Sequence, residues 1–156
     1  MKVLLPSDQA KKLVRALVRA GTSEIGGQLF GEQLAPSDFR IAELTVQSRP
    51  GTFARFVVDV IEAARAAAAF FRRTAHQYTR HNYIGEWHSH PSFAVSPSPT
   101  DTNTMRELVR STDFKGTFAV LMIVRLDSTE LRSGAWLFDP MGREQSVTLE
   151  VENGWQ

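Results

Sequence analysis

The sequence contains no cysteine. This absence excludes disulfides, catalytic thiols and thiolate metal sites, and it leaves imidazole and carboxylate groups as the only good metal ligands. No apolar run approaches the about 18 residues that a membrane-spanning helix needs. Residues 1–5 are too short for the apolar region of a signal peptide. We therefore expect a cytoplasmic protein that has no membrane as a partner.

The sequence also lacks an excess of either charge. Lysine and arginine number 18 against 17 aspartates and glutamates, which leaves a formal net charge of +1. So balanced a charge is not enough to recruit nucleic acid, and we expect no nucleic-acid partner. At 156 residues, with 42% hydrophobic and 22% charged residues, the chain has the composition of a globular protein. Its length predicts a single domain over residues 1–156.

The spacing of apolar residues predicts helices interleaved with strands. Apolar residues recur at three- and four-residue steps in the helical segments. They alternate roughly with polar residues over 24–34 and 39–47, and they form a nearly continuous run over 117–126 that suits a central strand. The predicted helices span 7–21, 59–78 and 100–111, and the predicted strands span 24–34, 39–47, 53–58, 82–90, 117–126, 130–138 and 144–151. This order predicts an α+β fold with mixed α/β/α layers around a largely antiparallel sheet.

A His-x-His pair stands near the end of one predicted strand. Residues two apart share a face of a strand, so His88 and His90 lie about 6.6 Å apart at Cα and their imidazoles can converge on one metal ion. Glu86 shares that face, but it is about 10 Å along the strand from a metal held between the histidines, beyond the reach of its side chain. The third ligand must come from elsewhere, and Asp101 is well placed to fold back over the strand end.

Asp101 has two interpretations. The segment Ser98-Pro99-Thr100-Asp101 matches a helix start, with Ser98 as N-cap and Asp101 at the third helical position. Taken alone, this pattern favours a capping box over a metal ligand. The two roles are partly compatible, because a carboxylate in the first turn of a helix is held rigidly.

Two histidines and one aspartate leave the fourth position of a tetrahedral zinc ion to water, as in catalytic zinc sites. Such a hydrolase needs a carboxylate to take a proton from that water. Glu24 and Glu32 are both candidates by composition. The pair Gly26-Gly27 favours Glu24, because paired glycines allow another backbone or a substrate to approach closely.

Three separated pieces of the sequence together form a recognisable pattern. They are residues 24–31 (EIGGQLFG), residues 88–91 (HSHP), and Ser98 and Asp101 after seven and two intervening residues. This pattern closely resembles the signature of the JAB/MPN metalloproteases, the JAMM family, and the order of the flanking elements resembles the family over essentially the whole chain. The resemblance implies a single JAB/MPN-like domain with a curved sheet flanked by helices.

Carried over residue by residue, the resemblance implies one zinc ion per chain, bound by His88, His90 and Asp101. It implies that Glu24 is the general base and then the general acid, and that Ser98 stabilises the oxyanion. These roles overrule the interpretation of Ser98 and Asp101 as a cap alone. Members of the family cleave peptide or isopeptide bonds after the C-terminal glycine of ubiquitin-like proteins, and that is the activity expected here.

The substrate is left open by the resemblance. The chain looks like the small stand-alone bacterial members, which act beside ubiquitin-like modifiers and their activating or conjugating enzymes, or trim the C-terminus of sulfur-carrier proteins. A non-catalytic MPN-type binding module is a further alternative, against which the complete residue set argues.

The loop between the His-x-His strand and the next helix is a candidate for substrate binding. Phe93 and Val95 are apolar residues beside the expected metal. They would suit a glycine-ending tail that adds as a strand to a sheet edge near residues 92–99. Trp87 and Ser89 are expected on the opposite face of the strand, with Trp87 in the core.

Overall fold

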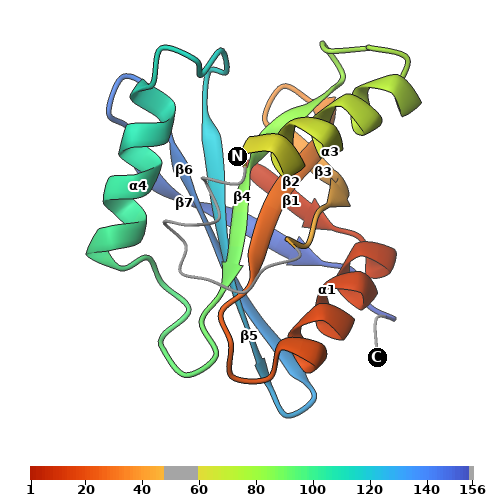
Figure 1. The fold of residues 1–156 in the computed structure, drawn as a ribbon, viewed down its shortest axis with the longest axis vertical. Coiled ribbons are helices and arrows are strands. Elements are labelled where there is room, and N and C mark those ends of the chain that lie inside the picture. Colours follow the sequence, from red (N-terminus) through yellow and green to blue (C-terminus); the bar gives the residue numbers. More distant parts are fainter. Residues whose placement is uncertain (48–59, 155–156) are drawn as a thin grey trace.

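A closed barrel of seven strands forms the centre of the computed structural model, which describes residues 1–47 and 60–154 (Figure 1). The strands are β1 (Lys2–Leu5), β2 (Gly26–Ala35), β3 (Asp38–Leu44), β4 (His81–Ser89), β5 (Ala119–Asp127), β6 (Glu130–Phe138) and β7 (Glu144–Val151). Around the barrel their order is β1-β3-β2-β4-β5-β6-β7. The β1/β3, β1/β7 and β4/β5 pairs are parallel and the others are antiparallel. The predicted α+β class and the largely antiparallel sheet are confirmed.

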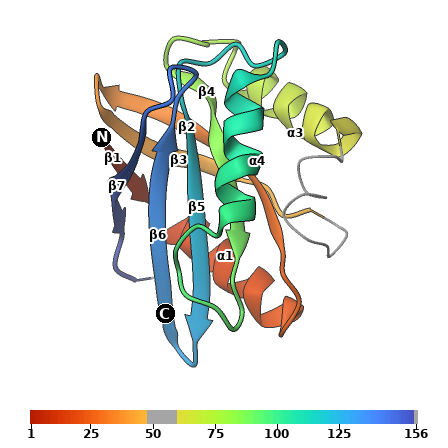
Figure 2. The same cartoon turned by 90° about the vertical axis from the view of Figure 1, so that its left-hand side faces the viewer.

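Three helices of the described residues cover the sheet, namely α1 (Ser7–Ala20), α3 (Val60–Arg73) and α4 (Pro99–Arg110) (Figure 2). Successive residues of β5 show which face each covers. Val120, Met122 and Val124 belong to one buried cluster with α1. Leu121 and Ile123 belong to a second cluster with α4. Because side chains alternate across a strand, α1 and α4 lie on opposite faces of β5, as the predicted layers require.

The pairing of β4 with β5 decides which way the side chains of β4 point. Gly85 pairs with Val120 and His88 pairs with Ile123 in a parallel register. His88 therefore points toward the α4 side, and Trp87, one residue earlier, points into the α1 cluster, where it is fully buried. The two strands approach so closely at Gly85 that a Cβ there would lie 1.9 Å from the Val120 carbonyl oxygen.

The structure differs from the sequence prediction at several elements. The four-residue strand β1, which pairs with β3 and β7, was not predicted. The helix predicted over 59–78 ends at Arg73, because Ala75 and His76 adopt positive φ angles of 51° and 55°, which a helix cannot contain. The strand predicted over 53–58 lies outside the described residues. No helix in the described ranges has the length and apolarity to cross a membrane.

Candidate metal centre

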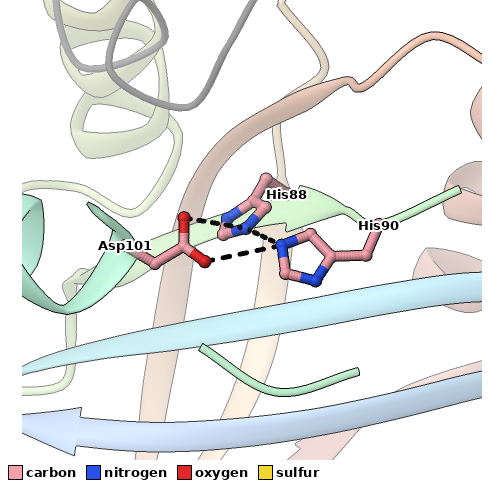
Figure 3. A group of neighbouring side chains, drawn as sticks. All are labelled: His88, His90 and Asp101. Carbon is pink, nitrogen blue, oxygen red and sulfur yellow. Dashed lines mark hydrogen bonds and ion pairs between the residues drawn. The ribbon is translucent and has the colours of Figure 1, made fainter. Parts of the chain in front are cut away.

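Two elements bring the predicted metal ligands together (Figure 3). His88 and His90 come from the end of β4, and Asp101 comes from the first turn of α4. The Nε2 atoms of the two histidines are 2.9 Å apart. Asp101 Oδ1 lies 3.5 Å from His88 Nε2, and Asp101 Oδ2 lies 3.5 Å from His90 Nε2. All three side chains are buried, so their polar atoms converge on one another away from bulk water.

These donor atoms fit a zinc ion. Zinc takes nitrogen and carboxylate oxygen ligands at about 2.0–2.1 Å, so two ligand atoms of a tetrahedral site lie about 3.3 Å apart. The observed separations of 2.9 and 3.5 Å bracket that value. His88, His90 and Asp101 therefore form a potential metal site that fits the JAMM motif.

Hydrogen bonds outside the cluster orient two of the three side chains. The ring of His90 is held by a contact of 2.7 Å between its Nδ1 atom and the carbonyl oxygen of Ala94. An Nδ1–H that donates to this carbonyl leaves Nε2 unprotonated and facing the other ligands. The Ser98 N–H donates to Asp101 Oδ2 at 2.7 Å, and the Asp101 N–H donates to Ser98 Oγ at 3.1 Å.

Asp101 thus belongs to the predicted capping box and to the cluster at once. Burial by itself would raise the pKa of Asp101, but the contact with His88 and the hydrogen bonds from Ser98 outweigh it and lower the pKa to about 2. The carboxylate is therefore ionised at neutral pH, as a metal ligand must be.

The remaining catalytic candidates line the same pocket of about 580 Å³ as the three ligands. Glu24 reaches it from the segment before β2, and Ser98 reaches it from the N-terminus of α4. Glu32, the other candidate base, is instead held in an ion pair, in which Arg80 Nε donates to Glu32 Oε1 at 2.8 Å. Glu32 is not among the residues that line this pocket.

Ser89 positions the segment that carries Glu24, a role that the sequence reasoning missed. The Ile25 N–H donates to Ser89 Oγ at 3.0 Å, and the Ser89 N–H donates to the Ile25 carbonyl at 2.8 Å. This pair of bonds ties the residue after Glu24 to the residue between the two histidines. A serine on the predicted core face of a strand needs a hydrogen-bond partner, and that was the available signal.

The two apolar loop residues have different surroundings. Phe93 lines the pocket, is 59% exposed and meets the His90 ring edge to face at 6.1 Å. Val95 packs instead against the cluster that contains Met105 of α4, and it is not among the pocket residues. The Val95 side chain therefore helps to anchor the loop, and its contact with substrate stays a prediction.

Glu86 and Gly27 also have structural roles. Glu86 is buried, accepts a hydrogen bond from the Tyr83 hydroxyl at 2.7 Å and is not part of the ligand cluster. Burial raises its pKa to about 8, against the lowering effect of that hydrogen bond. At Gly27 a Cβ would lie 2.1 Å from the carbonyl oxygen of Thr45, so this glycine admits the backbone that follows β3.

The comparison with known families agrees with the fold and the site. A family model of prokaryotic homologs of the JAB domain (Prok-JAB) matches residues 6–137. The chain belongs to this family, and the JAB/MPN resemblance of the sequence is thereby confirmed.

One curated relative adds a more particular likeness. The chain is 25% identical over 123 residues to a protein named CD-NTase/cGAS isopeptidase from Enterobacter hormaechei subsp. hoffmannii (strain UCI 50). The match covers 78% of this chain and 66% of that protein, just under two thirds of its length. The family and this name support a peptidase- or isopeptidase-like hydrolase.

Two solved structures share the fold. A solution structure of a protein from Desulfitobacterium hafniense matches with a TM-score of 0.66 and 15% identity, over 99% of this chain and 95% of that one. A crystal structure of a JAB1/MPN domain protein from Archaeoglobus fulgidus matches with a TM-score of 0.51 and 19% identity, over 97% of this chain and 98% of that one. At these identities the likeness shows the fold alone.

The raised pKa of Glu86 predicts a pH-dependent stability of the metal-free protein. Between the ordinary value of 4.5 and the folded value of about 8, the folded chain keeps a proton that the unfolded chain has released. The free energy of unfolding should therefore fall as the pH rises, by up to about 1.4 kcal/mol per pH unit from this group. Glu86→Gln should remove that contribution.

The measurement is urea unfolding of chelator-treated protein at pH 5, 6, 7 and 8. Glu130→Gln is the matched control, because it removes a carboxylate from an ion pair between two well-exposed side chains. Equal slopes in the wild type and Glu86→Gln would contradict the prediction.

Proposed function

We propose that this chain is a zinc-dependent isopeptidase or peptidase that cleaves after the C-terminal glycine of a ubiquitin-like protein. The observation that carries the proposal is the meeting of Glu24, Ser98 and the three candidate ligands around one pocket. One zinc ion per chain would be held by His88, His90 and Asp101. The name of the Enterobacter relative supports an isopeptide bond as the target.

Each catalytic step is assigned to a group of the pocket. When bound, zinc would act as a Lewis acid and lower the pKa of a water molecule toward about 7. Glu24 accepts a proton from the attacking water and then delivers it to the leaving amine nitrogen. The Ser98 hydroxyl accepts a hydrogen bond from the Asp101 N–H and keeps its own proton, so its O–H can donate a hydrogen bond to the scissile carbonyl oxygen as negative charge develops there.

The pocket supports a narrow extended tail as the substrate. The sequence suggested that the tail adds as a strand to a sheet edge. The barrel is closed and offers no free edge, so we do not propose that binding mode. We place the tail instead between Glu24 and the loop that carries Phe93, which both line the pocket. Small glycine residues at the scissile bond let the chain approach buried ligands, and the exposed Phe93 ring offers an apolar contact to the tail.

The proposed partner is a ubiquitin-like protein or a sulfur-carrier protein that ends in glycine, together with the activating or conjugating enzyme of that protein. Deconjugation and C-terminal trimming use the same chemistry and differ in the leaving group. A non-catalytic module would not need Glu24 beside three intact ligands, and we do not favour it.

The first test is metal content. Purified protein should contain one zinc per chain, and the double variant His88→Ala/His90→Ala should contain none, because two of three donors are gone. Elemental analysis measures this, with His76→Ala, an exposed imidazole outside the pocket, as control. Full zinc occupancy in the double variant would show that the ligands are wrongly assigned.

The second test separates chemistry from metal binding. Glu24→Gln keeps the size of the side chain but cannot accept a proton, so turnover should fall about 10²- to 10⁴-fold while zinc stays bound. Steady-state cleavage of a ubiquitin-like fusion and metal analysis of the same sample give the two readouts. Glu32→Gln serves as control, and its activity should stay within a few-fold of the wild type. A fully active Glu24→Gln protein would refute the role given to Glu24.

The third test addresses the substrate. A fusion that carries a ubiquitin-like protein should be cleaved when its tail ends in glycine and resist cleavage when bulky residues replace the glycine. Phe93→Ala should raise KM more than it lowers kcat, because the ring contacts the tail and not the reacting atoms. Leu34→Ala removes a comparably exposed apolar side chain, 55% exposed, outside the pocket. Equal cleavage of both tails would refute specificity for a ubiquitin-like protein and would indicate a general peptidase.

A further inference from the structure

We propose that Arg125 of β5 is a positioning residue for the metal centre. It holds the loop between β4 and α4 at the Phe93 carbonyl, and through that loop it fixes the orientation of His90. This inference rests on the proposed zinc site and assigns a function to a side chain outside the ligand set and outside the pocket.

The Arg125 guanidinium contacts the loop directly. Arg125 Nη1 donates to the Phe93 carbonyl oxygen at 2.7 Å. The other edge of the guanidinium faces Asp127: Nη2 donates a hydrogen bond to Oδ2 at 2.8 Å, and Nε lies 2.7 Å from Oδ1 in an ion pair outside hydrogen-bond geometry. A planar guanidinium held by a carboxylate on one edge has little freedom left, so Nη1 presents a fixed donor to the loop.

The carbonyl that orients His90 belongs to the next residue of the loop. Ala94 O contacts His90 Nδ1 at 2.7 Å, and the carbonyl that Arg125 holds is that of Phe93. The Phe93 and Ala94 carbonyls belong to consecutive peptide units, and only the φ and ψ angles of Ala94 separate them. Because no other rotation lies between them, holding the Phe93 carbonyl restricts the directions that the Ala94 carbonyl can take. The backbone of His90 itself donates to the carbonyl of Val124, the neighbour of Arg125, at 2.9 Å.

The loop has a further point of attachment to the β5–β6 hairpin. Val95 packs beside Trp136 in the cluster under α4. At Gly134 a Cβ would lie 3.3 Å from the Val95 carbonyl oxygen and 2.5 Å from the Trp136 ring, so this glycine makes room for both. Val95 is an apolar anchor, whereas Arg125 is the polar contact that acts on the residue before Ala94.

The chain offers a matched control in Arg132. Arg132 Nε pairs with the same carboxylate, at 2.7 Å from Asp127 Oδ2, and Arg132 also forms an ion pair with Glu130. Replacing either arginine by methionine removes one partner of Asp127. Only the Arg125 variant also removes the hydrogen bond to the loop.

The experiment measures metal affinity and coordination geometry together. Zinc affinity is determined by competition with a chromogenic chelator, and the visible absorption of the cobalt-substituted protein reports the geometry. Arg125→Met should bind zinc about 10- to 100-fold more weakly and alter the cobalt spectrum, as loss of groups that orient metal ligands does. Arg132→Met should match the wild type in both. Arg125→Lys, which keeps the charge but has one donor nitrogen in place of the planar guanidinium, should fall between them.

The measurements distinguish failure of the Arg125 role from failure of the proposed zinc site. Thermal melts of the metal-free variants identify a change that is only structural, because such a change lowers stability without altering the cobalt spectrum of the folded protein. If Arg125→Met and Arg132→Met have the same zinc affinity and the same cobalt spectrum, the positioning role of Arg125 is refuted and the zinc site is not. A wild-type protein that binds neither metal would overturn the zinc site itself.

Discussion

The backbone pairing of β4 with its two neighbours is the constraint on which the site depends. On one side, β4 pairs with β5 so that His88 lies beside Ile123. On the other, His88 pairs with Gly26 of β2, and the hydrogen bonds of Ser89 to Ile25 bring Glu24 to the pocket. Because side chains alternate along β4, the imidazoles of His88 and His90 point toward the α4 side, and Trp87 and Ser89 point toward the α1 side. A shift of register by one residue would turn the ligands into the α1 cluster and the tryptophan toward the α4 side.

The capping box at α4 links local helix stability to the chemistry of the site. Asp101 accepts the Ser98 N–H and faces both imidazoles with its two oxygens. A carboxylate that could contact only the Ser98 N–H or only the imidazoles would be either a poor ligand or a poor cap. Because the cap fixes the carboxylate before any metal arrives, the third ligand costs little additional conformational entropy.

The sequence predicted those parts of the fold and the site that depend on local spacing. The strand period placed His88 and His90 on one face, and the capping pattern located Asp101 at the start of a helix. The closure of the barrel was not predicted, because β1 is four residues long and its two parallel pairings join segments far apart in the chain. The role of Ser89 and the anchoring of Val95 were missed for the same reason, since both depend on which distant element lies opposite.

Two glutamates near the centre differ in environment, and that difference supports their separate roles. Glu24 lines the pocket that the three candidate ligands also line. Glu86 shares a strand face with the histidines but is buried, and its hydrogen bond from Tyr83 occupies one oxygen. Burial raises the pKa of Glu86 to about 8, which disfavours the ionised form that a general base needs. A general base needs both access to the water and an ionised carboxylate, and Glu24 is the glutamate whose position in the pocket meets the first requirement.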